Sequence, residues 1–230
     1  MPLFPCDNPT PDGCEEEDDV VNNTGGPCLG DIIRSLQEKD QNGALVPDLE
    51  GMQHLSQVVL ELFGNCSNYD LEITSEELGT DSHGNQINAG TAGITTIIID
   101  DDLIDDATRL SIAKTLIHES MHLYINFTAH VYNSDWSFIR SIQSYYATYN
   151  NDSNLSQHNF MSEFVEALAY SLSAYDNHRQ DMSYYKAMSW GGLESSVACQ
   201  ALQQDEKNEI QRIINNERYA TRDAKSAKCP

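Results

Sequence analysis

The residues of this chain best suited to chemistry lie in one pentapeptide, His118-Glu119-Ser120-Met121-His122. Residues four apart share one face of an α-helix, so His118 and His122 can reach the same metal ion. Glu119 can act as a general base toward a water molecule beside that ion. An HExxH pattern arises by chance in roughly one chain in a hundred of this length, so the flanking residues must support the interpretation.

The flanking residues predict a buried helix over about residues 106–127. Asp105 and Asp106 are candidates for its N-cap. Apolar side chains occupy almost the whole circumference of this helix, which is typical of a core helix. They are Ile112, Ala113, Leu116, Ile117, Met121, Leu123 and Tyr124. Each polar group of the motif would cost about 1–3 kcal/mol if buried without a partner, and a metal ion with its water would satisfy all three. A surface helix with two incidental histidines fits this pattern less well.

The segment Thr115–Tyr124 resembles the active-site helix of the zincin superfamily of zinc metallopeptidases. The resemblance implies Zn²⁺ as the cofactor, a peptide or protein as the substrate, and Glu119 as the general base. Residues 94–176 are also similar to uncharacterised secreted bacterial metallopeptidase-like domains, in which a His-x-x-Met segment follows the HExxH helix. In this chain that segment is His158-Asn159-Phe160-Met161.

A catalytic zinc ion needs a third protein ligand and an open position for water. The metzincin spacing is absent, because Ile125 and Thr128 stand where that branch has glycine and its third histidine. His158, expected at a loop-to-helix junction, is the preferred third ligand, and Glu166 and Glu163 are the alternatives. If His158 binds the metal, an inward glutamate would orient a ligand imidazole; if a glutamate binds it, His158 would be a solvated loop residue.

The resemblance also implies a place for the substrate. Residues 94–99 occupy the position of the zincin edge strand, which lies along the cleft and pairs with an extended peptide. We therefore expect Ile94, Thr95, Thr96 and Ile97 to bind substrate.

The elements around the motif predict an α+β fold of the zincin type. Strands are expected near 69–74 and 93–99, since both segments are rich in β-branched or alternating apolar residues. A short helix is expected to begin at Asp31. Further helices are expected over about 48–63, 106–127, 135–149, 159–176, 181–189 and 193–218. Residues 1–30 are expected to be an acidic tail or linker rich in Pro, Gly and Cys. Residues 31–230 are expected to form one domain, with a helix–strand lobe over 31–127 and a helical lobe over 128–230.

Six cysteines and no CxxC pair favour disulfides over a zinc ribbon or a redox site. Disulfides indicate a secreted or otherwise extracytoplasmic protein. The first residues form no signal peptide, so the chain is interpreted as a piece of a larger secreted polypeptide.

The charge balance excludes several classes of partner. With 13 basic and 36 acidic residues the formal net charge is −23, which disfavours nucleic acid and anionic lipid as partners. No apolar run is long enough for a membrane span. Two other functions remain open: a catalytically idle zincin-like binding module of a larger surface protein, and a metalloprotease toxin or effector domain with a narrow target.

Overall fold

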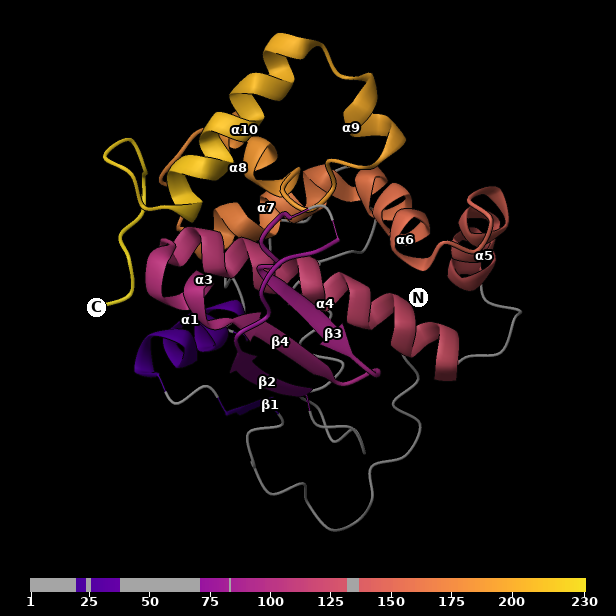
Figure 1. Cartoon of the computed structure of the whole chain (residues 1–230), viewed down its shortest axis with the longest axis horizontal. Coiled ribbons are helices and arrows are strands. Elements are labelled where there is room, and N and C mark those ends of the chain that lie inside the picture. The colour runs from indigo at the N-terminus through magenta and orange to yellow at the C-terminus, as the bar shows by residue number, and fades with distance from the viewer. Residues whose placement is uncertain (1–19, 24–25, 38–70, 83, 132–136) are drawn as a thin grey trace.

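The computed structural model of the chain describes residues 20–23, 26–37, 71–82, 84–131 and 137–230. These residues form an α+β fold that is mainly helical, as predicted. Helix α4 (Arg109–Val131) crosses the middle of the molecule (Figure 1). The sheet and helix α1 (Pro27–Gln37) lie on one side of it, and helices α7 (Val165–Tyr175), α8 (Met182–Ser189) and α10 (Gln204–Arg218) lie on the other.

The sheet has the strand order β1 (Val20–Asn22), β2 (Leu71–Glu76), β4 (Thr96–Asp100) and β3 (Ala89–Ala92). Strands β1, β2 and β4 are parallel, and Ile73 of β2 lies opposite Ile97 of β4. Strand β3 is antiparallel to β4, with Thr91 opposite Ile97. Three consecutive isoleucines make β4 a strand, because β-branched side chains favour the extended backbone.

The expectation of an edge strand over residues 94–99 is wrong. Thr96 and Ile97 belong to β4, whose backbone pairs with β2 on one side and β3 on the other. The Thr95 carbonyl accepts a hydrogen bond from the Glu72 backbone N–H at 2.9 Å, and Ile94 lies in the turn between β3 and β4. On this side of β4 the described sheet ends with β3, a strand that was not predicted. Its pairing with β4, rather than its own propensity, makes it extended.

The predicted tail over residues 1–30 also needs correction. Val20–Asn22 pairs with β2 as strand β1, and α1 begins at Pro27 rather than at Asp31. Proline suits the first turn of a helix, where its missing N–H has no intrahelical partner. The predicted strand over 69–74 is confirmed from Leu71 onward as β2, and residues 69 and 70 lie outside the described residues.

The predicted buried helix around the HExxH motif is confirmed as α4. Its first turn is capped by Thr108, whose hydroxyl oxygen accepts the Ser111 backbone N–H at 3.2 Å. The two aspartates predicted as caps belong instead to the short helix α3 (Asp101–Asp106).

The remaining helical elements are α5 (Ser137–Thr148), α6 (Ser153–Met161), the 3₁₀ helix η1 (Ser162–Phe164) and α9 (Val197–Ala201). The predicted helix over 159–176 is therefore divided by η1, and the predicted helix over 193–218 is interrupted before α10. The predicted helix over 48–63 lies outside the described residues. Of the helices that the structure describes, none combines the length and apolar character needed to cross a membrane.

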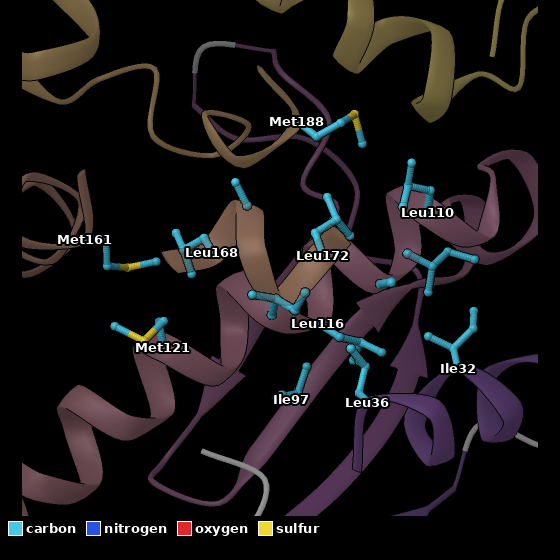
Figure 2. Close-up of a cluster of buried hydrophobic side chains, with 14 of the residues drawn as sticks. Ile32, Leu36, Ile97, Leu110, Leu116, Met121, Met161, Leu168, Leu172 and Met188 are labelled. Carbon is cyan, nitrogen blue, oxygen red and sulfur yellow. The ribbon is translucent and has the colours of Figure 1, made fainter. Parts of the chain in front are cut away.

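The hydrophobic core surrounds α4 from both sides, which explains why this helix is apolar on most of its circumference. Figure 2 shows Ile97 of β4 and Leu36 of α1 on the sheet side, and Leu168 and Leu172 of α7 on the opposite side. All four side chains are buried.

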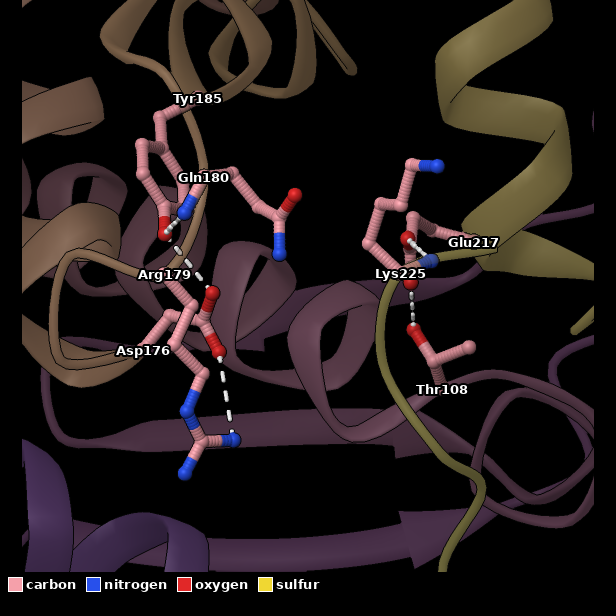
Figure 3. Close-up of polar contacts among 7 residues, drawn as sticks. All are labelled: Thr108, Asp176, Arg179, Gln180, Tyr185, Glu217 and Lys225. Atoms are coloured by element: carbon pink, nitrogen blue, oxygen red, sulfur yellow. Dashed lines mark hydrogen bonds and ion pairs between the residues drawn. The ribbon is translucent and has the colours of Figure 1, made fainter. Parts of the chain in front are cut away.

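A buried polar group, here called the Glu217 cluster, fixes the start of α4 to α10. The fully buried Glu217 carboxylate accepts hydrogen bonds from the Thr108 hydroxyl, from the Tyr184 hydroxyl at 2.5 Å and from the Lys225 backbone N–H at 2.6 Å. Figure 3 shows Glu217 between Thr108 and Lys225. Each carboxylate oxygen thus has a donor, so the burial of this acid is compensated.

A disulfide joins α1 to the C-terminal segment, which confirms the disulfide predicted from the cysteine count. Cys28 and Cys229 are 201 residues apart in sequence, and their Cα atoms are 5.7 Å apart. Cys199 is a free, buried thiol. The other cysteines, Cys6, Cys14 and Cys66, lie outside the described residues.

Candidate metal centre

Three histidines from two helices converge on one point. His118 and His122 lie one turn apart on α4, and His158 comes from α6. The Nε2 atom of His122 is 3.1 Å from Nε2 of His118 and 3.2 Å from Nε2 of His158. Each side chain offers one nitrogen, and the three ligand atoms lie within 4.8 Å of one another, close enough to hold one metal ion. These three side chains are called the histidine cluster.

Helix α6 determines where His158 lies. The Asp152 carboxylate caps this helix by accepting the Leu155 backbone N–H at 2.9 Å. His158 therefore lies in the second turn of a helix, and the predicted loop-to-helix junction at this residue is wrong. A helical backbone holds the imidazole more firmly than a loop would, which suits a metal ligand.

The two glutamates considered as alternative third ligands lie away from the cluster. Glu163 accepts a hydrogen bond from the Tyr145 hydroxyl, and Glu166 forms an ion pair with Lys186 at 2.5 Å. Both glutamates line a separate cavity of about 950 Å³ between η1, α7, α8 and α10, which the histidines do not line. Neither glutamate orients a ligand imidazole through a hydrogen bond among the described residues.

The turn after α8, with the sequence Trp190-Gly191-Gly192-Leu193, lies against the histidine cluster. Gly192 has φ +92°, and a Cβ atom at this position would lie 2.6 Å from Cε1 of His118. Both the backbone conformation and the close approach require glycine. In the same loop, Ser195 Oγ lies 3.4 Å from Nδ1 of His158.

Sequence reasoning missed the contact between this glycine turn and His118. It also missed Gln157, whose Oε1 atom lies 2.5 Å from Nδ1 of His122. In the sequence, the Gly-Gly pair was the only sign that this turn could approach another group closely. The position of Gln157 next to His158 was the only sign that this glutamine could belong to the site.

Burial lowers the pKa of all three histidines. The pKa of His118 lies well below its usual value because of burial and, after that, the neighbouring His122 and His158. Burial and the nearby His122 lower the pKa of His158 to about 4. Burial also lowers the pKa of His122, against a smaller opposing effect of its hydrogen bond to Gln157. The cluster is therefore neutral at pH 7, which is the form that binds metal.

Glu119 has the opposite shift. Its side chain is 8% exposed, and burial raises its pKa to about 7, against the opposing charge of Lys114. Lys114 lies one helical turn before His118. A carboxyl group with a pKa near 7 can both accept and return a proton at neutral pH.

Two of the three nitrogen–nitrogen separations fit a zinc ion. Two ligands at 2.0–2.1 Å from a tetrahedral zinc lie about 3.3–3.4 Å apart, close to the 3.1 and 3.2 Å that separate the Nε2 atoms. Neutral imidazoles also suit copper and nickel. Three protein ligands with a fourth position for water are typical of catalytic zinc sites.

Comparisons with known protein families, with curated proteins and with solved structures found no match to this chain. The sheet and helices alone do not determine an activity, since one fold can host many chemistries. Function is therefore inferred from the histidine cluster and Glu119.

Proposed function

We propose that this chain is a zinc-dependent metallopeptidase of the zincin type. His118, His122 and His158 would hold Zn²⁺, and Glu119 would be the general base. The observation that carries the proposal is the convergence of three imidazole nitrogens, two of them from α4. Glu119, a buried carboxyl group with a pKa of about 7, follows His118 in α4. The order of residues along α4 agrees with the resemblance to the zincins.

Each residue has a defined task in this proposal. A zinc ion held by these three ligands would supply Lewis acidity, which would lower the pKa of a bound water toward 7 and polarise a peptide carbonyl. Glu119 would accept a proton from water and return it to the leaving amine. Gly192 and Ser195 lie against His118 and His158 and restrict the rotation of these rings.

The substrate in this proposal is an extended peptide. Extended peptides bind by adding a strand to the edge of a sheet. In the described sheet, the end strand next to β4 is β3 (Ala89–Ala92), which also packs against α4. We expect the substrate to pair with β3 rather than with residues 94–97.

The compartment follows from the disulfide. A bond between Cys28 and Cys229 is typical of a protein that folds under oxidising conditions. We propose that the chain acts outside the cytoplasm.

Two substitutions in α4 test the proposal. Glu119→Gln removes the base and keeps the size of the side chain, so hydrolysis of a denatured protein should fall by at least about 100-fold while zinc content stays the same. His118→Ala should lose both zinc and hydrolysis. Glu166→Gln is the matched control, because Glu166 is 68% exposed and paired with Lys186, and it should leave both unchanged. Full activity in Glu119→Gln would contradict the proposal.

The same assay separates the alternatives. A wild-type protein that binds zinc without cleaving denatured protein would be either an idle binding module or an effector with a narrow target. Toxicity to host cells that disappears in Glu119→Gln would identify the effector.

A further inference from the structure

We propose that Gln157 is a positioning residue that keeps the His122 ring in the tautomer and orientation needed for metal binding through Nε2. The inference rests on the proposed metal site. It concerns a residue outside both the HExxH motif and the ligand set.

The first support is the contact between the two side chains. Gln157 Oε1 lies 2.5 Å from Nδ1 of His122, and an amide oxygen can only accept a hydrogen bond. The His122 Nδ1 atom must therefore carry the proton. In a neutral imidazole this leaves Nε2 with a free lone pair, and Nε2 is the atom that faces His118 and His158.

The second support is the way the amide itself is held. Gln157 Nε2 donates to Asn126 Oδ1 and to the Tyr146 hydroxyl, each at 2.8 Å. Both donors of the amide are thus used on the side away from His122, and the side chain is buried, with 3% of its surface exposed. These contacts fix which end of the amide faces the imidazole.

The third support is the set of elements that the amide connects. Asn126 lies on α4 one turn beyond His122, Tyr146 lies on α5, and Gln157 precedes His158 on α6. One short stretch of α6 therefore supplies a metal ligand and also orients a ligand that belongs to α4. Packing of α6 on α4 would assemble both features together.

Gln157 is also neutral, unlike a carboxylate in the same position. A carboxylate would make the imidazole a more basic metal ligand and would reduce the net positive charge of the metal site. A neutral acceptor fixes the ring and leaves that charge undiminished.

The test compares three variants of the full chain with the wild type. Gln157→Leu removes the acceptor, and its affinity for Zn²⁺, measured by competition with a chelator, should fall about 10- to 100-fold. Gln157→Glu keeps an acceptor at the same place and should bind Zn²⁺ at least as tightly as the wild type. Gln211→Leu is the control, because Gln211 is an exposed glutamine whose amide contacts only Asn215 among the described residues, and it should bind Zn²⁺ normally.

A second measurement reads the tautomer directly in metal-free protein. Imidazole ¹⁵N NMR of the wild type should show His122 protonated at Nδ1, and Gln157→Leu should show a mixture of tautomers. Zinc affinity within about threefold of wild type in folded Gln157→Leu, or a wild-type His122 protonated at Nε2, would overturn the proposal. A wild type that binds no Zn²⁺ would refute the metal site, while the NMR result would still decide the role of Gln157.

Discussion

Two buried polar clusters among the described residues, the Glu217 cluster and the histidine cluster, are built in opposite ways. In the Glu217 cluster, each carboxylate oxygen accepts a hydrogen bond from a neighbouring donor. In the histidine cluster, ring nitrogens face one another at 3.1 and 3.2 Å. Nδ1 of His118 is buried without a hydrogen-bond partner among the described residues.

The difference matches a structural role for the Glu217 cluster and the proposed metal-binding role for the histidine cluster. A buried polar group that is fully hydrogen-bonded stabilises the fold, whereas one left without partners costs free energy. The Glu217 cluster joins the start of α4 to α10 and needs nothing further. The histidine cluster instead brings three ring nitrogens together, close enough to hold one metal ion. Lowered histidine pKa values such as these are typical of functional centres.

The largest expected difference between the two clusters is in the free energy of unfolding of the metal-free protein. Glu217→Ala would leave the hydroxyl groups of Thr108 and Tyr184 and the Lys225 backbone N–H without their acceptor. The free energy of unfolding should therefore fall by about 3–5 kcal/mol. His158→Ala removes a ring whose polar contacts are long, at 3.4 Å to Ser195 Oγ and 3.2 Å to Nε2 of His122, and it should change the same quantity by about 1 kcal/mol or less. Chemical denaturation of the metal-free proteins measures both.

Glu217→Gln serves as the control for this comparison. The amide keeps one acceptor oxygen and nearly the same volume, so its loss of stability should be smaller than that of Glu217→Ala. If His158→Ala destabilised the metal-free protein as much as Glu217→Ala, the two clusters would not differ as described.

A smaller effect is expected in the pH dependence of stability. An unfolded histidine takes up a proton near pH 6.5, but folded His158 resists protonation until about pH 4. The unfolded state thus binds more protons in this range, and the free energy of unfolding should fall as the pH decreases from 6.5 to 4. His118 and His122 act in the same direction.

Glu119 opposes this trend. The folded carboxyl keeps its proton up to about pH 7, whereas the unfolded one loses it near 4.5, so its contribution to stability decreases as the pH rises through this range. Glu119→Gln removes the opposing effect, and the loss of stability between pH 6.5 and 4.5 should become steeper. Denaturation curves of the metal-free variant and wild type at several pH values measure the slope, and an unchanged or shallower slope would refute the assignment.

Local patterns were sufficient to predict α4 and its motif, because residues four apart on one helix share a face whatever the rest of the chain does. The place of His158 depends on how α6 packs on α4, which no local spacing encodes. Gly192 could not be recognised as a site residue for the same reason, since its role is to leave room for a ring that lies 74 positions earlier in the sequence.

The strands show the same limit. The isoleucines of β4 were recognised as a strand, but its position inside the sheet was not, because the neighbouring β3 contains only Ala89, Gly90, Thr91 and Ala92. These small residues carry little strand preference of their own. Tertiary pairing therefore decided which strand lies at the end of the sheet.

Metal analysis of the purified protein tests the central claim most directly. The wild type, exchanged into metal-free buffer after loading with Zn²⁺, should retain about one equivalent of zinc. His158→Ala should retain much less, and Glu217→Gln, which leaves the histidine cluster intact, should retain as much as the wild type. Zinc below about a tenth of an equivalent in the folded wild type would contradict the account.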